Sequence, residues 1–213
     1  MRTTATQFVE WRNGAESWKY QGRKYSVATV WNDIRPRQNE VEWQRLVWSS
    51  LTIPRHGLIV WMALLDRLPT LNRLATWGYQ VDGMCRLCQS QMETRDHLFF
   101  GCSFTKIIWE SVLKLCNQRR DVGSWTEELN WAVKRTQGRT LVSLILRIAW
   151  RACIYLTWKG RNQRLYKNRR ASPELIVKNI KEIVRYRLLT ICTVVDNSVN
   201  RQLCVSWGLS FFD

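Results

Sequence analysis

The sequence predicts a mainly α-helical protein with a short N-terminal β-hairpin, a small cysteine-containing loop, and a helical bundle with long basic C-terminal helices. Three observations lead to this fold class. Apolar residues recur at helical spacing along most of the chain, a glycine turn separates two strand-like runs near the start, and Lys and Arg dominate the second half. The 213 residues, 46% of them hydrophobic, suffice to build a core. We divide the chain into a loop-containing domain, 1–120, and a basic helical region, 121–213.

The hairpin is expected where residues 16–20 and 23–25 flank Gln21-Gly22. Glycine accepts the positive φ that a two-residue hairpin turn requires, so the two runs should pair as antiparallel strands. Ser26 then provides the N-cap of a helix that Pro36 ends.

Helices account for most of the remaining chain. Leu58, Trp61 and Leu65 fall on one face of a helix that begins at Pro54 and ends before Pro69. The other expected helices begin near Glu40, Thr70, Ser103, Trp125 and Pro173. The last residues, 197–213, show no pattern that assigns them.

The stretch 141–158 is apolar over about the thickness of a membrane, yet Arg147 and Arg151 lie inside it, one helical turn apart. Each central arginine would cost about 2.5–3.5 kcal/mol on membrane-insertion scales. We therefore predict a buried helix with a basic stripe and no contact with a membrane. The N-terminus also lacks an apolar run that would serve as a secretory signal, which favours a reducing compartment.

The charge balance points to a polyanionic partner. Lys and Arg outnumber Asp and Glu by 33 to 17, which gives a net charge of +16. Residues 129–173 contain no acidic residue, and we expect phosphate contacts there without sequence preference. The candidates are Arg147, Arg151, Lys159, Arg161, Arg164, Lys167, Arg169 and Arg170. A solvated basic face that merely keeps the protein soluble is the alternative.

Four of the potential metal ligands lie close together in the sequence. Cys85 and Cys88 form a Cys-x-x-Cys turn, and His97 and Cys102 follow within one short segment. Three thiolates and one imidazole are a ligand set for one structural Zn²⁺ with no open position. Buried small residues around a core histidine are the alternative. A Cys85–Cys88 disulfide would leave His97 and Cys102 unexplained, and seven cysteines cannot all pair.

An ordered series of motifs extends this pattern. It comprises Pro54-Arg-His-Gly-Leu-Ile-Val-Trp61, Arg67-Leu-Pro-Thr70, Trp77-Gly78, Cys85-x-x-Cys88, Glu93-Thr94, His97-Leu-Phe-Phe100 and Cys102. The series resembles the zinc-binding domain that follows the reverse transcriptase of plant LINE-type (non-LTR) retrotransposons, over most of residues 20–170. The resemblance implies a nucleic-acid-binding module that is stabilised by zinc, with Cys85, Cys88, His97 and Cys102 as the zinc ligands.

Catalysis has no evident place in the sequence. The carboxylates are scattered along the sequence and form no convincing pair. The glycine-containing motifs of phosphate-binding loops (P-loop and GxGxxG) and of serine hydrolases (GxSxG) do not occur. The aspartate-rich metal motif of a reverse transcriptase does not occur either, so we expect a stand-alone or truncated copy that is not an enzyme. The resemblance implies DNA or RNA phosphates and a reverse transcriptase domain as partners, inside the cell and in the nucleus rather than the cytoplasm.

A scaffolding or protein-interaction remnant is the alternative function, because the sequence contains 13 tryptophans. Most of them recur at helical spacing with Leu, Ile and Val, which favours a place in the core. Trp158, beside Lys159 and Arg161, is the candidate for stacking on a base.

Overall fold

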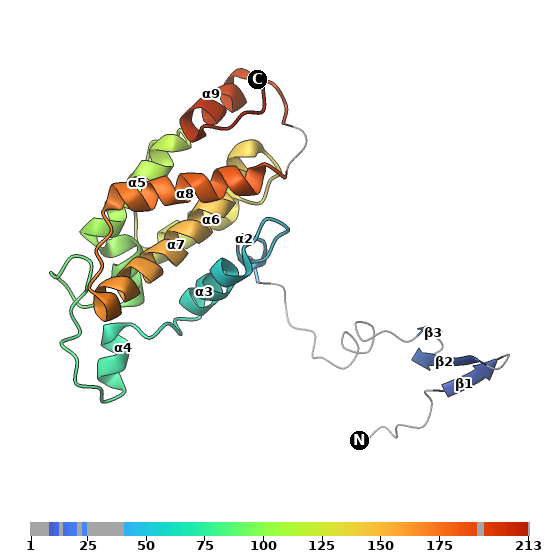
Figure 1. The fold of residues 1–213 in the computed structure, drawn as a ribbon, viewed down its shortest axis with the longest axis horizontal. Coiled ribbons are helices and arrows are strands. Elements are labelled where there is room, and N and C mark those ends of the chain that lie inside the picture. Colours follow the sequence, from blue (N-terminus) through green and yellow to red (C-terminus); the bar gives the residue numbers. More distant parts are fainter. Residues whose placement is uncertain (1–8, 13–14, 21–22, 25–40, 191–193, 213) are drawn as a thin grey trace. The chain divides into compact units, whose positions relative to one another are not determined.

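The computed structural model describes residues 9–12, 15–20, 23–24, 41–190 and 194–212 (Figure 1). The chain divides into two compact units, Met1–Val41 and Glu42–Asp213. The first unit contains the strands β1 (Val9–Arg12), β2 (Ala15–Tyr20) and β3 (Arg23–Lys24), antiparallel in the order β1-β2-β3. Tyr20 pairs with Arg23 on either side of the predicted turn. The turn itself and the helix predicted from Ser26 lie outside the described residues.

The second unit is helical, which confirms the predicted fold class. Its elements are α2 (Gln44–Val47), α3 (Pro54–Leu64), α4 (Leu71–Thr76), the π-helix η1 (His97–Gly101), α5 (Ser103–Leu115), α6 (Trp125–Arg135), α7 (Leu141–Lys167), α8 (Pro173–Leu188) and α9 (Ser198–Trp207). The helix α9 occupies the tail that the sequence left unassigned. Both predicted regions, 1–120 and 121–213, contribute helices to this one unit, and their division by function stays a prediction.

The helix α7 is the centre of the second unit. It packs against α3, α5, α6 and α8, and Figure 1 shows α8 lying along it. In the described chain, α7 is the one helix long and apolar enough to cross a membrane by length and composition, and 78% of its most apolar window is buried inside the protein. The apolar side chains of α7 therefore pack in the core of the protein. This burial agrees with the buried helix that the two internal arginines predict.

Aromatic rings fill the space between α5, α6, α7 and η1. The Phe100 ring centroid lies 5.9 Å from that of Trp109, 5.8 Å from that of Trp125 and 6.3 Å from that of Trp150. All four rings are buried. Rings at this separation add attraction beyond the burial of their area, so this cluster fixes η1 against the bundle.

A buried carboxylate orders the link between α5 and α6. Glu128 accepts hydrogen bonds from Trp109 Nε1 at 2.7 Å, from the backbone nitrogen of Gly123 at 2.7 Å, and from both terminal nitrogens of Arg120 at 2.8 and 2.5 Å. The next helix begins at a capping box, in which Ser124 and Glu127 exchange hydrogen bonds.

Candidate metal centre

The four predicted ligands come together in the structure. The ligand atoms of Cys85, Cys88, His97 and Cys102 all lie within 4.8 Å of one another. The sulfurs of Cys85 and Cys102 are 4.0 Å apart, and Cys88 Sγ lies 3.2 Å from His97 Nε2. In a tetrahedron with Zn–S bonds of about 2.3 Å, two sulfurs lie about 3.8 Å apart. The cluster is compatible with one zinc ion.

Local backbone structure explains why these residues converge. An antiparallel bridge joins Met84 to Met92, and Cys85 N donates to Gln91 O at 2.9 Å, so the chain folds back on itself around the Cys-x-x-Cys turn. The turn closes where Gln89, in a left-handed conformation with φ 57°, donates its N–H to Cys85 O at 2.8 Å. We call residues 85–89 the cysteine turn.

The other two ligands flank η1. His97 begins this π-helix, and Cys102 is the N-cap of α5. Cys102 N donates to His97 O at 2.6 Å. This hydrogen bond closes one π-helical turn and so brings Cys102 back beside His97. Phe99 and Phe100, which lie between the two ligands, are buried in the core. The core thereby aims both ligands at the cysteine turn.

The cluster holds a proton that a metal would replace. Without a metal, the hydrogen bond between the two sulfurs raises the pKa of Cys85 and lowers the pKa of Cys102. Zinc binds thiolates and so releases such protons.

Asp96, which adjoins His97, is exposed and pairs with Arg95 at 2.6 Å. His97 Nδ1 is buried without a hydrogen-bond partner, so Asp96 does not orient this ring.

Arg164 on α7 reaches the backbone of the cysteine turn. Its Nη1 donates to Leu87 O at 2.8 Å and to Arg86 O at 3.4 Å, and its Nη2 donates to Ala171 O at 3.2 Å. A zinc ion with three thiolates and one neutral imidazole would carry a net charge of −1. The Arg164 guanidinium therefore positions the turn and offsets this charge from the side of α7.

A second arginine of α7 holds the segment between Cys88 and His97. Arg161 donates from Nε at 2.9 Å and from Nη2 at 2.7 Å to Glu93 Oε1, which also accepts from Leu71 N at 2.9 Å. Both side chains of the ion pair are at most 1% exposed. Glu93 thus connects three parts of the protein, namely α4, the segment after the cysteine turn, and α7. Its position in the sequence gave no sign of this role.

Half of the predicted phosphate-contact residues have partners inside the protein. Arg161 and Arg164 have the internal partners described above. Arg151 is 1% exposed and donates to Ser49 Oγ at 2.9 Å and Thr52 Oγ1 at 2.6 Å, and half-buried Arg147 donates to the carbonyl oxygens of Thr136 and Gly138. The remaining four side chains are exposed, namely Lys159, Lys167, Arg169 and Arg170.

The predicted stacking residue Trp158 is also internal. It is 7% exposed, and the Arg161 guanidinium lies over its ring at 4.7 Å. A base cannot reach a ring that is covered in this way.

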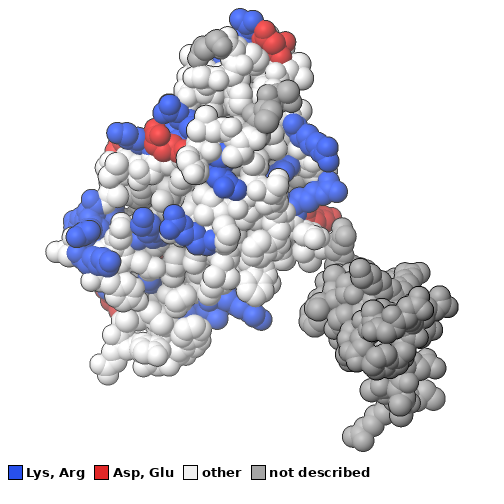
Figure 2. Space-filling model, turned by 45° about the vertical axis from the view of Figure 1, so that its right-hand side comes forward, with Lys and Arg blue, Asp and Glu red and all other residues white. Residues whose placement is uncertain are grey.

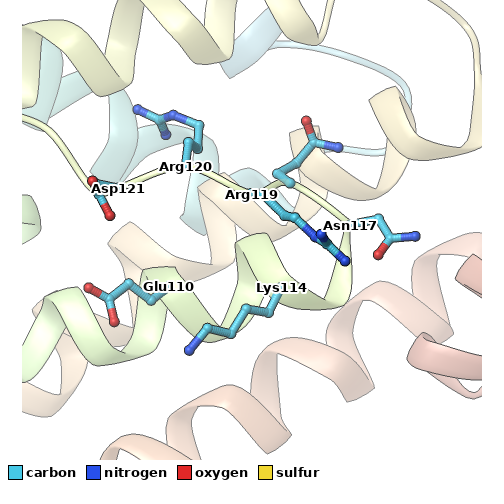
Figure 3. A pocket seen from close by; sticks show the side chains of 7 residues that line it. Glu110, Lys114, Asn117, Arg119, Arg120 and Asp121 are labelled. Carbon is cyan, nitrogen blue, oxygen red and sulfur yellow. The ribbon is translucent and has the colours of Figure 1, made fainter.

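A pocket of about 560 Å³ lies between α5 and the chain that follows it (Figure 3). Its wall is formed by Glu110, Lys114, Asn117, Gln118, Arg119, Arg120 and Asp121. Two carboxylates face the same space as three cations, and Arg120 is already bonded to Glu128. Because charges of both signs line it, this pocket attracts phosphate less than an all-cationic surface would.

Comparison with known proteins agrees with this geometry. Residues 25–109 match the family described as zinc-binding in reverse transcriptase. The matched segment contains the whole cluster, so the predicted resemblance to this zinc-binding domain is confirmed, while the LINE type stays a prediction.

One relative of this chain is an uncharacterized mitochondrial protein of Arabidopsis thaliana. It is 32% identical over 73 residues, which are 33% of this chain and 51% of that protein. The chain therefore spans about half the length of the curated relative that it matches. No solved structure matches.

Proposed function

We propose that this chain is a non-catalytic module in which Cys85, Cys88, His97 and Cys102 bind one structural Zn²⁺ and an exposed basic surface binds nucleic acid with little sequence preference. The convergence of the four ligand atoms within 4.8 Å carries the proposal. Three sulfurs and one nitrogen complete a tetrahedron and leave no position for a water molecule. A site of this kind stabilises a fold and does not hydrolyse a substrate.

Metal content tests the first half of the proposal. We expect one zinc per chain in protein purified from zinc-supplemented cells, and its loss in Cys88→Ser. The matched control is Cys153→Ala, because Cys153 is a buried cysteine of α7 outside the cluster and its replacement should leave the zinc in place. Wild-type protein without zinc, or retention of zinc by Cys88→Ser, would contradict the assignment.

The proposed nucleic-acid surface is the set of exposed cations at the end of α7. Lys167 is the last residue of α7, Arg169 and Arg170 follow after Asn168, and Lys159 lies about two turns earlier on the helix. Among the ion pairs of the described chain, none engages these four side chains. Figure 2 shows one face of the second unit, on which blue predominates over red. Unpaired cations release counterions from a phosphate backbone and so bind it without reading bases.

Charge reversal tests the second half. The triple variant Lys167→Glu, Arg169→Glu and Arg170→Glu should weaken binding of a labelled RNA or DNA on the order of tenfold or more, equally for unrelated sequences. The control variant reverses the charge of Lys134, Arg135 and Arg139 and so changes the net charge by the same amount. These three exposed cations lie at the other end of the basic run, residues 129–173, which contains no acidic residue. Fluorescence anisotropy over a salt series measures both. A flat response to salt, or equal losses in the two variants, would refute this surface.

The alternative function, a protein-interaction module, has one observation in its favour. Trp77 and Tyr79, at the end of α4, are 53% and 63% exposed. The guanidinium beside Trp77 belongs to Arg73, which is already paired with Asp66 at 3.7 Å, so this patch is not strongly cationic. Under this alternative, Trp77→Ser with Tyr79→Ser abolishes binding to a protein partner and leaves nucleic-acid affinity unchanged. A reverse transcriptase domain as that partner, and a nuclear location, stay predictions.

A further inference from the structure

One face of α7 carries a line of exposed and half-buried side chains toward the end of the helix. Tyr155, Lys159, Asn162 and Tyr166 are spaced by four, three and four residues, which places them on one side of an α-helix. At 1.5 Å per residue the line is about 16 Å long. We call Lys159, Asn162 and Tyr166 the α7 stripe.

The two tyrosines on this face differ in their surroundings. The Tyr155 ring is half-buried and stacks on His56, with the ring centroids 4.0 Å apart. The Tyr166 ring is 70% exposed and makes no contact with another ring or a guanidinium in the described part of the chain. An aromatic face so open to water is available to a partner.

The charge around Tyr166 selects the chemistry of that partner. Lys167 follows it directly, Asn168 ends the helix in a left-handed conformation with φ 48°, and Arg169 and Arg170 continue from there. None of these cations has a carboxylate partner within the described residues. The open ring is thus followed along the chain by three cations, Lys167, Arg169 and Arg170, that have no carboxylate partner among the described residues.

The cations beside two other exposed aromatic residues, Trp77 and Tyr186, already have partners. Arg187, which follows Tyr186, donates to the backbone carbonyl oxygens of Ser50, Leu51 and Thr52. The arginine over Trp77 is paired with Asp66, and Arg185, next to the 71% exposed Tyr186, is paired with Glu182 at 3.1 Å. The combination of an open ring with free cations distinguishes Tyr166 from both of them.

We propose that the α7 stripe and the cations that follow it bind single-stranded nucleic acid, with an unpaired base stacked on Tyr166 and the flanking phosphates on Lys159, Lys167 and Arg170. This inference rests on the proposed function and adds the form of the nucleic acid. Stacking on an aromatic side chain contributes about 1–3 kcal/mol per base, and every base offers a face for it. A duplex keeps its bases inside its own stack, so it gains only the phosphate contacts.

The experiment compares a twenty-nucleotide oligo(dT) with a duplex of equal length, using the full zinc-loaded chain and fluorescence anisotropy. Tyr166→Ala should weaken oligo(dT) binding about thirtyfold, which is the middle of the stacking range, and leave duplex binding nearly unchanged. Tyr166→Phe keeps the ring and should restore the affinity. Tyr186→Ala, which removes an equally exposed tyrosine from α8, should bind both ligands as the wild type does.

A second measurement locates the base directly. Oligo(dT) that contains 5-iodouracil should form a photochemical crosslink to the peptide that includes Tyr166, detected by mass spectrometry. Because the ring is exposed, Tyr166→Ala should keep its zinc and its thermal midpoint, and these two controls separate lost contact from lost fold.

The outcomes separate the two proposals. Equal affinity for oligo(dT) and duplex, an unchanged Tyr166→Ala, or a crosslink elsewhere would overturn stacking on Tyr166, while binding that is lost on charge reversal would leave the proposed function intact. Absence of binding to any nucleic acid would overturn both.

Discussion

Arg161 on α7 and Glu93, between the second and third cluster residues, form a buried ion pair across 68 positions of sequence. The carboxylate also accepts the backbone N–H groups of Leu71 at 2.9 Å and Arg86 at 3.3 Å. One pair of side chains therefore joins α4, the cysteine turn and the central helix. The position of the metal cluster in the bundle depends on this pair.

Removing one partner of this pair should destabilise the protein strongly. Arg161→Ala leaves a buried carboxylate without its cation, at a cost of about 3–5 kcal/mol. Urea unfolding of the zinc-loaded protein measures this loss. The double variant Arg161→Met with Glu93→Met should cost less than Arg161→Ala, because neither charge remains. The opposite result would be an Arg161→Ala variant that is as stable as wild type but binds nucleic acid weakly. That result would support the phosphate contact that the sequence predicted for Arg161.

Arg164 should govern zinc affinity without being a ligand. Arg164→Gln loses the guanidinium that holds the carbonyl oxygens of Leu87 and Arg86, and we expect zinc affinity to fall about 10–100-fold. Competition with a chromogenic chelator measures the affinity. The control is Arg139→Gln, which removes an exposed cation from outside the cluster and should bind zinc normally. Equal affinities in the two variants would contradict the positioning role.

His56 should make stability depend on pH. Burial, with smaller contributions from Arg55 and Arg151, lowers its pKa from 6.5 to about 4. The unfolded chain therefore binds a proton more readily than the folded one, so the stabilising contribution is present above pH 6.5 and is lost as pH falls toward 4. His56→Phe removes this titration.

The measurement for His56 is the difference in unfolding free energy between wild type and His56→Phe across that pH range. Wild type should lose on the order of 2 kcal/mol more than the variant between pH 7 and pH 4. Zinc release in acid affects both proteins and cancels in the difference. Parallel pH profiles would show that His56 is not the responsible group.

Glu128 should be far more important than its neighbour Glu127. Glu128→Ala leaves Trp109 Nε1 and Gly123 N without their acceptor and Arg120 without its carboxylate, at a cost of about 3 kcal/mol. Glu127→Ala removes only the exposed half of the capping box and should cost much less than Glu128→Ala. Thermal unfolding compares the two. Similar midpoints would mean that the link before α6 does not depend on the buried carboxylate.

Local sequence was sufficient for several helix starts and for the cluster, although it did not predict α9. Ser172 and Pro173 mark the start of α8 because capping depends only on adjacent residues. Cys85 and Cys88 share one tight turn, and His97 and Cys102 flank one turn of helix, so their spacing alone indicated a common ion.

The assignment of the basic residues required the tertiary structure. Arg161 and Lys167 belong to the same basic run, yet the first is buried against Glu93 and the second is exposed. A carboxylate so distant in sequence leaves no periodic signal beside the arginine that it pairs with. Trp158, the predicted stacking residue, is buried and Tyr166 is exposed for the same reason, since the position of α7 in the bundle decides which of its faces meets solvent.

The amino-acid sequence by itself determined the zinc ligand set, the helical class and the excess of positive charge, because each depends on residue type and short-range spacing. Only the tertiary structure decided which arginines support the metal cluster and which remain free for a partner. Burial and ion pairing arise from contacts between segments that the chain brings together only when it folds.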